Sequence, residues 1–155
     1  MNMHAYENEA NPHHKRPGYR SFPSRMGLNE AWYYPDWLAV HLRLTGMPDS
    51  EQYRAANLYG VELTKAHGLQ CWISDMRQAG VLDVADVEWT NTVLVDLALE
   101  AGILYLVQLK DNNPFSDANE EEWADTVEER GVQTLQTPSL EEAREWVLAR
   151  SALNA

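Results

Sequence analysis

The chain has 155 residues and a net charge of −12, so it suits one domain that buries its own hydrophobic core without a disulfide or a metal to hold it together. No apolar run approaches the roughly 18 residues of a membrane span, and so acidic a surface repels phosphate backbones, which argues against nucleic-acid binding. The single cysteine and the polar start, which lacks a signal-peptide pattern, lead us to expect a cytoplasmic protein. Its excess of acidic residues serves solubility or attracts a basic partner.

Residues 1–28 are expected to form a flexible tail, followed by one α/β domain over 29–150 and a frayed end over 151–155. The tail holds three of the seven prolines and few aliphatic side chains, so it buries little to offset the entropy cost of ordering it. Its pair His13 and His14 could ligate a metal, but no second cluster of ligands accompanies the pair. We therefore expect no metal and no cofactor.

An aromatic hairpin comes next. Residues 31–34 favour a strand, Pro35 and Asp36 are turn residues, and residues 37–45 alternate in the manner of a half-buried strand. Neighbouring side chains of a strand point to opposite faces, so at most half of the aromatic side chains can face the core. An exposed remainder would form an interface with a protein partner or with a second copy of the chain. The candidate interface residues are Trp32, Tyr33, Tyr34 and Trp37.

The rest of the chain alternates between helical and strand patterns. A helix over 49–68 has both ends marked, by a capping box at Asp49 and Gln52 and by the left-handed stop that Gly68 favours. Further helices are predicted over 83–100, 119–130 and 139–150, and further strands over 69–74, 103–109 and 132–136. The order β-β-α-β-α-β-α-β-α predicts an α/β fold with a single mixed sheet and parallel crossovers.

A polar segment follows the predicted central strand over 69–74, at its carboxyl end, where open α/β sheets gather ligands. Asp75 and Arg77 stand two residues apart, so both side chains can face one side and pair. Asp83 and Asp86 stand near the start of the next helix, which either of them can cap. The four residues form a candidate binding or regulatory loop. The alternative is an ion pair of Asp75 and Arg77 that only shapes the loop.

Little in the sequence equips an enzyme. It has no phosphate-binding glycine pattern, no cysteine pair and no sign of paired carboxylates in contrasting surroundings. The available catalytic side chains are Asp75, Arg77, His41 and Cys71, and a cysteine inside an apolar strand is typically an inert core residue. An enzyme would bring two or more of these side chains together in one concave pocket.

Several spread-out motifs resemble those of a known family. They are Tyr34-Pro35-Asp36-Trp37 ahead of an alternating strand that ends at Thr45-Gly46, Ser74-Asp75-Met76-Arg77, Trp89 in the second helix, Ala101-Gly102 before an apolar strand, and Ser139-Leu140-Glu141-Glu142-Ala143 with Trp146. In this pattern the chain resembles the STAS-like, SpoIIAA-like domains of bacteria over about residues 30–150. The resemblance implies a four- or five-stranded sheet with helices mainly on one side.

The resemblance also carries an expected function. Anti-sigma-factor antagonists of this fold bind a partner kinase and are switched by phosphorylation of a serine at the start of the second helix. This chain has no Ser or Thr between Asp75 and Thr90, so the switch is not carried over. The resemblance therefore implies a non-enzymatic protein-interaction or regulatory module without that serine. Other members resemble lipid-binding folds, which gives the alternative of a small apolar or lipid-like ligand held between the sheet and its helices.

Overall fold

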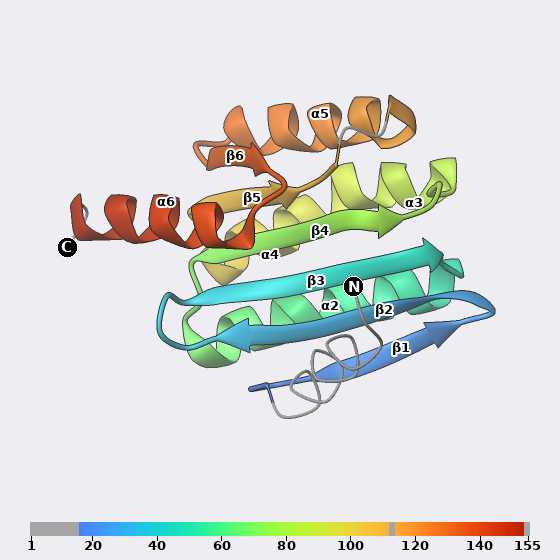
Figure 1. Cartoon of the computed structure of the whole chain (residues 1–155), viewed down its shortest axis with the longest axis horizontal. Coiled ribbons are helices and arrows are strands. Elements are labelled where there is room, and N and C mark those ends of the chain that lie inside the picture. The colour runs from blue at the N-terminus through green and yellow to red at the C-terminus, as the bar shows by residue number, and fades with distance from the viewer. Residues whose placement is uncertain (1–15, 112–113, 154–155) are drawn as a thin grey trace.

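The computed structural model describes residues 16–111 and 114–153, which form an α/β fold around one mixed sheet (Figure 1). The six strands of this described part lie side by side in the order in which they occur in the chain. They are β1 Arg20–Ser24, β2 Met26–Tyr34, β3 Ala39–Met47, β4 Cys71–Ala79, β5 Tyr105–Leu109 and β6 Gln133–Thr137. β1, β2 and β3 pair antiparallel, whereas β3, β4, β5 and β6 are parallel. The predicted α/β class and single mixed sheet are confirmed.

Helices follow each of the parallel strands. They are α2 Ser50–His67, the continuous helical segment of α3 Val84–Trp89, η1 Thr90–Leu94 and α4 Val95–Ala101, then α5 Pro114–Glu128 and α6 Leu140–Leu153. Helix α2 has the predicted bounds, with Asp49 at the N-cap position and Gly68 left-handed at φ 62°. The predicted capping box with Gln52 does not form. The Asp49 carboxylate instead accepts a hydrogen bond from the backbone N–H of Arg25 at 3.0 Å.

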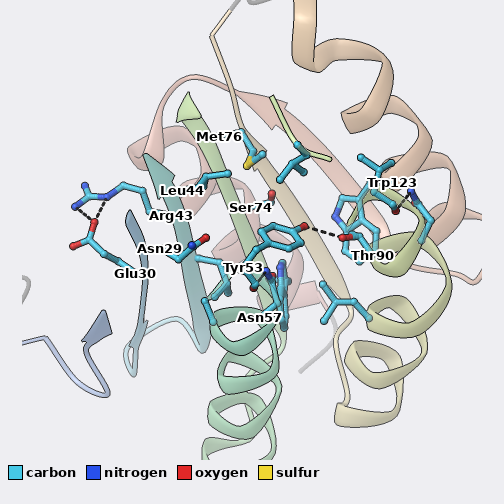
Figure 2. Close-up of a pocket in the computed structure, with 17 residues that line it drawn as sticks. Asn29, Glu30, Arg43, Leu44, Tyr53, Asn57, Ser74, Met76, Thr90 and Trp123 are labelled. Carbon is cyan, nitrogen blue, oxygen red and sulfur yellow. Dashed lines mark hydrogen bonds and ion pairs between the residues drawn. The ribbon is translucent and has the colours of Figure 1, made fainter. Parts of the chain in front are cut away.

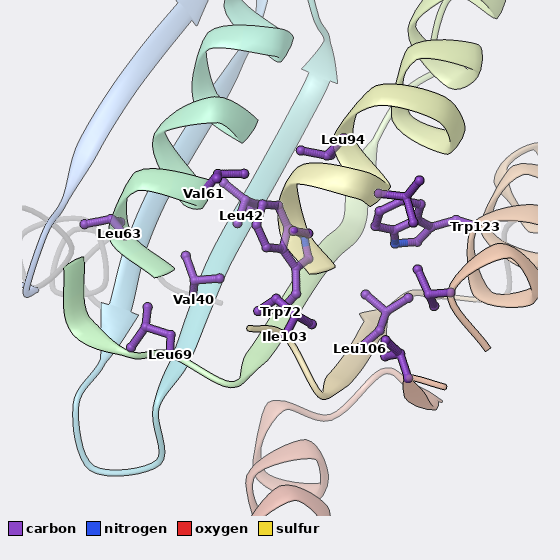
Figure 3. Close-up of a cluster of buried hydrophobic side chains, with 14 of the residues drawn as sticks. Val40, Leu42, Val61, Leu63, Leu69, Trp72, Leu94, Ile103, Leu106 and Trp123 are labelled. Atoms are coloured by element: carbon purple, nitrogen blue, oxygen red, sulfur yellow. The ribbon is translucent and has the colours of Figure 1, made fainter. Parts of the chain in front are cut away.

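Two hydrophobic clusters lie on opposite faces of the sheet. The larger one joins Val40, Trp72 and Leu106 to side chains of α2, α4 and α5 (Figure 3). The smaller one joins Ala39 and Cys71 to side chains of α6. Because neighbouring strand residues such as Ala39 and Val40 point to opposite faces, α6 packs on the face opposite α2. The described helices therefore cover both faces, and α6 departs from the expectation of helices mainly on one side.

The sheet begins inside the segment that the sequence assigned to a flexible tail. β1 pairs antiparallel with β2, and Phe22 is buried against Tyr59 of α2, with ring centroids 5.8 Å apart. Backbone pairing and one aromatic anchor thus order a strand with little apolar sequence, which raises the strand number from the expected four or five to six in the described residues. Residues 1–15, which include His13 and His14, lie outside the described residues.

β4 extends beyond its predicted end. The sequence predicted a strand over 69–74 and a loop from Asp75, but the strand continues to Ala79. Its neighbour β3 is long enough to pair with it as far as Gly46, which lies opposite Ala79. Pairing with the longer neighbour therefore overrides the polar sequence, and both Asp75 and Arg77 lie within a strand.

The last two helices also differ from their predicted bounds. α5 begins at Pro114, earlier than the predicted start at residue 119, because proline suits the first position of a helix. α6 follows Ser139, whose hydroxyl accepts a hydrogen bond from the Glu142 N–H at 3.1 Å as the capping pattern predicted. The helix runs on to Leu153, into the segment that was expected to fray.

Candidate functional site

A cavity lies between the sheet and the helices, toward the carboxyl ends of β3 and β4 (Figure 2). Asn29, Leu44 and Ser74 line it from the strands, and Tyr53 of α2 and Thr90 of η1 line it from the helices. Its volume is about 50 Å³, which is room for a few water molecules. In open α/β sheets ligands bind at this end of the parallel strands.

The helix wall of the cavity contains an irregular turn. The residues of η1 form a π-helix, a rare geometry that occurs frequently at functional sites. The Thr90 hydroxyl donates to the Asp86 carbonyl at 2.8 Å, and it therefore accepts from the Tyr53 hydroxyl at 2.7 Å. This hydrogen bond joins η1 to α2 and holds the Tyr53 ring in the cavity wall (Figure 2).

Two residues that line the cavity each carry a buried amide atom without a hydrogen-bond partner among the described residues. The two atoms are Nδ2 of Asn29, a residue that is 3% exposed, and Oδ1 of Asn91. The Asn91 amide is oriented by its other atom, because Nδ2 donates to the Val87 carbonyl at 3.0 Å. Burying a donor or an acceptor unpaired costs roughly 1–3 kcal/mol. Almost none of the surface of either atom is accessible, so both amide atoms are closed off from the space inside the cavity.

The cavity is electrically neutral. Of its lining residues in the described chain, only Glu30 and Arg43 carry charge, and these two pair with each other. Arg43 donates to Glu30 Oε1 from Nε at 3.0 Å and from an Nη atom at 2.8 Å. Figure 2 shows both charged groups pointing away from the cavity, so only polar uncharged and apolar groups face the interior.

The predicted pair of Asp75 and Arg77 forms, in a buried network on the opposite face of the sheet. Arg77 donates to both carboxylate oxygens of Asp75, each at 2.9 Å. His41 Nε2 lies 2.8 Å from Asp75 Oδ2, and its Nδ1 lies 3.0 Å from the Tyr34 hydroxyl. We call Tyr34, His41, Asp75 and Arg77 the Asp75 network. None of its members lines the cavity.

Burial and pairing shift the pKa values in the Asp75 network in opposite directions. Burial is the largest influence on Asp75 and by itself raises the pKa of the carboxyl, but hydrogen bonds from His41 and Arg77, together with the charge of Arg77, outweigh it and lower that pKa. Burial lowers the pKa of His41 against the opposing hydrogen bond with Asp75. A neutral His41 fits the geometry, since Nε2–H donates to Asp75 and Nδ1 accepts from Tyr34.

We expect the protein to lose stability as the pH falls. The pKa of His41 is lower in the folded protein than its ordinary value of 6.5, so the unfolded chain binds a proton first. This contribution to stability is complete above pH 6.5 and declines as the pH falls through the lowered value. The lowered pKa of Asp75 adds a loss of the same sign below about pH 4. Urea unfolding measured between about pH 7.5 and about pH 4 follows both losses.

The histidine part of this prediction has a matched control. His41→Gln should abolish the decline between about pH 6.5 and about pH 5. His67→Gln replaces an exposed histidine that stacks on Tyr33, and it should keep the decline. The same pH dependence in wild type and in His41→Gln would contradict the assignment.

The four residues of the predicted loop site fall into three separate sets of contacts. Asp75 and Arg77 belong to the Asp75 network, whereas Asp83 caps α3 by accepting from the Ala85 N–H at 3.0 Å. Asp86 is 1% exposed and ties α3 to α2 by accepting from the Ser50 hydroxyl at 2.7 Å and from Arg54 Nε at 3.0 Å. Of the two alternative caps, Asp83 is therefore the one used.

The aromatic hairpin and the cysteine are mostly internal. Trp32 and Trp37 are 1% and 5% exposed, so these two indoles offer a partner almost no surface, and Tyr33 and Tyr34 are only half-buried. Trp32 stacks on His41, with ring centroids 4.2 Å apart. Cys71 is fully buried, and burial raises the pKa of its thiol, so the reactive thiolate is disfavoured.

Sequence reasoning missed the residues that line the cavity. Thr90, Asn91 and Thr92 follow one another inside a helix although all three residue types are poor helix formers. That run was a usable signal of an irregular, functional turn. Asn29 carries no such signal, because it stands next to the expected tail and its burial depends on α2 packing over β2.

The described residues carry no sign of a metal centre or of a membrane span. Among the described residues, no group of three or more His, Cys, Asp or Glu side chains is arranged to hold a metal ion. None of the described helices combines the length and the apolar character needed to cross a bilayer. Comparison with models of known families, with curated proteins and with solved structures finds no match, so the chemistry of the cavity has to be inferred from its own residues.

Proposed function

We propose that this chain is a non-enzymatic binding module that takes a small amphipathic ligand between the sheet and helices α2 and η1. The observation that carries the proposal is the cavity at the carboxyl ends of β3 and β4, which polar side chains such as Asn29 and Ser74 line together with apolar ones such as Trp72. A few convergent polar groups in a partly apolar pocket are typical of small-ligand sites.

The size of the cavity limits how much of a ligand it encloses. Pockets for whole drug-sized molecules measure roughly 300–1,000 Å³, whereas this one measures about 50 Å³. We therefore infer that a polar head group enters and that the apolar remainder lies along Met76, Leu82 and Val87, the partly exposed apolar side chains of the lining. This narrows the lipid-like ligand suggested by the family resemblance to a smaller amphipathic one.

The contacts of the titratable side chains support binding over catalysis. Asp75, His41 and Arg77 converge, but they pair with one another inside the protein and do not line the cavity. Cys71 lies in the core beside α6, away from the cavity lining. A catalytic group has to reach a substrate within hydrogen-bond distance, and these four side chains are placed for structural roles.

Protein contact is a second candidate function, supported by exposed apolar side chains where β2 begins and β3 ends. Met26 is 75% exposed and lies opposite Met47 across the strand pair. The N–H of Val81, a residue that is 57% exposed, lies 3.2 Å from the Met47 sulfur. This patch, rather than the buried tryptophans of the hairpin, is the surface that a protein partner or a second copy would cover.

Titration with 1-hexanol, a small amphipathic probe, tests the ligand proposal. We expect saturable shifts in the ¹H–¹⁵N spectrum at the side-chain amides of Asn29 and Asn91. Asn29→Leu should abolish the shifts while leaving stability unchanged or higher, because it replaces an unpaired buried amide by an apolar group. Gln78→Leu, an amide-to-leucine change on the exposed part of β4, is the control and should bind as wild type does. Shifts spread over the surface, or equal binding by Asn29→Leu, would refute the proposal.

A further inference from the structure

The outer edge of β6 carries unpaired backbone groups. β6 is an edge strand of the described sheet (Figure 1), and on its inner side the Gln133 N–H donates to the Leu104 carbonyl at 3.1 Å. The N–H and C=O of one strand residue point to the same edge, and successive residues alternate between the two edges. The backbone groups of Thr134 and Gln136 therefore point outward, and no described residue pairs with any of these four groups.

β6 lacks the features that commonly prevent strands from adding to a sheet edge, which are proline, charged side chains and bulges. Its sequence is Gln-Thr-Leu-Gln-Thr, with neither proline nor charge, and it pairs with β5 without a shift of register. The opposite edge strand, β1, contains Arg20 and Pro23. The two edges therefore differ, and β6 is the one suited to accept another strand.

Side-chain contacts on both faces of the sheet hold β6 in place. Leu135 packs against the smaller hydrophobic cluster, on the face that α6 covers. The Gln136 amide donates to Gln108 Oε1 at 2.8 Å on the opposite face. The side chains of Gln133 and Gln136 are nevertheless exposed, so this edge is in contact with solvent. The outward backbone groups are thus both accessible and fixed in direction.

The edge is complementary to itself when one copy is reversed. In an antiparallel pair of strands, every second pair of opposite residues exchanges two N–H···O bonds. With a two-fold axis beside Leu135, Thr134 lies opposite Gln136 of the second copy, and the two exchange both bonds. The symmetry repeats this exchange on the other side of Leu135, so all four outward groups of each copy are paired. A two-fold contact of this kind closes at the dimer.

We propose that β6 is a dimerisation edge, which pairs antiparallel with β6 of a second copy of this chain and joins the two sheets into one. The inference is independent of the ligand cavity, whose lining includes no residue of β6. A second copy fits because its own β6 supplies the matching register and brings no charge to the pairing. The net charge of −12 on each copy opposes the association, so added salt should tighten the dimer by screening the repulsion.

Sedimentation equilibrium of the full chain, from micromolar to millimolar concentration, tests the proposal together with hydrogen exchange. We expect a monomer–dimer equilibrium whose Kd falls as sodium chloride is added. The backbone amides of Thr134 and Gln136 should become protected from exchange as the dimer forms, whereas those of Gln133 and Leu135, which face β5, should not change. A monomer at every concentration, or protection of Thr134 and Gln136 that is independent of concentration, would overturn the proposal.

Three variants locate the contact. Gln136→Pro removes an outward N–H, a position at which edge strands tolerate proline, and should weaken the dimer about tenfold or more because two of its four hydrogen bonds are lost. Gln136→Ala keeps the N–H and should dimerise as wild type does. Met26→Lys places a charge on the exposed methionine patch and should also leave the dimer unchanged. A dimer that Met26→Lys disrupts and Gln136→Pro does not would refute the assignment to β6. If Gln136→Pro fails to fold, the exchange measurement on the wild type decides.

Discussion

Replacing Asp75 by alanine is expected to lower the free energy of unfolding by about 3–5 kcal/mol, the usual cost of removing one partner from a buried ion pair. The carboxylate is 1% exposed and accepts hydrogen bonds from His41 and from two nitrogens of Arg77. Its removal leaves the half-buried guanidinium without the carboxylate that pairs with it and the imidazole N–H without an acceptor. Urea unfolding at neutral pH, followed by tryptophan fluorescence, measures the loss.

An exposed aspartate supplies the control for this substitution. The Asp36 carboxylate is 59% exposed and pairs with Arg144 at 3.1 Å. Exposed pairs contribute little, so Asp36→Ala should change the free energy of unfolding by less than about 1 kcal/mol. Similar small losses for Asp36→Ala and Asp75→Ala would mean that the Asp75 network adds no more to stability than a surface pair does.

Replacing Trp72 by alanine is expected to have a comparable effect, lowering the free energy of unfolding by about 3–5 kcal/mol. The indole is 2% exposed, belongs to the larger hydrophobic cluster beneath α2 and also lines the cavity (Figure 3). Its removal takes away apolar contacts and joins the space it leaves to the existing cavity. The same urea measurement gives the magnitude.

Added indole should restore part of the stability of Trp72→Ala, because a ligand that binds only the folded state stabilises it. Trp146→Ala is the comparison. Trp146 is half-buried on α6, where it packs edge-on against Tyr105 and under Arg150. It should cost less stability and should not respond to indole. An indole response in both variants, or in neither, would refute the link between Trp72 and the cavity.

The parts of the fold that sequence reasoning predicted well are those whose signal is local. The C-terminal end of α2 follows from Gly68, which takes the left-handed conformation that the sequence predicted. The strand β5 is apolar because it is buried on both faces between parallel neighbours. These features need no knowledge of distant contacts.

The parts that were wrong depend on contacts with other elements of the fold. β1 contains Pro23 and polar residues, and it is ordered by pairing with β2 and by Phe22 meeting α2. β4 continues past Asp75 because β3 lies beside it. The spacing of Asp75 and Arg77 predicted that they can pair, but the burial of the pair depends on His41 from another strand. Tertiary context of this kind overrides local preference.

The candidate site was missed for the same reason. The cavity is formed where β2, β3 and β4 meet α2 and η1, so its lining comes from segments that are separate in sequence. The unpaired state of Asn29 and Asn91 appears only once the surrounding chain is in place. No motif search finds two amides that are defined by the absence of a partner within the described residues.

The strand order has a consequence for how the chain assembles. Each described strand pairs only with the strands next to it in the chain, so no pairing has to span more than one intervening helical segment. The parallel pairs from β3 to β6 still have to close these crossovers, which makes them slower to form than the hairpins of β1, β2 and β3. During synthesis each strand that emerges from the ribosome finds its neighbour already made. The sheet can therefore grow strand by strand from β1 to β6.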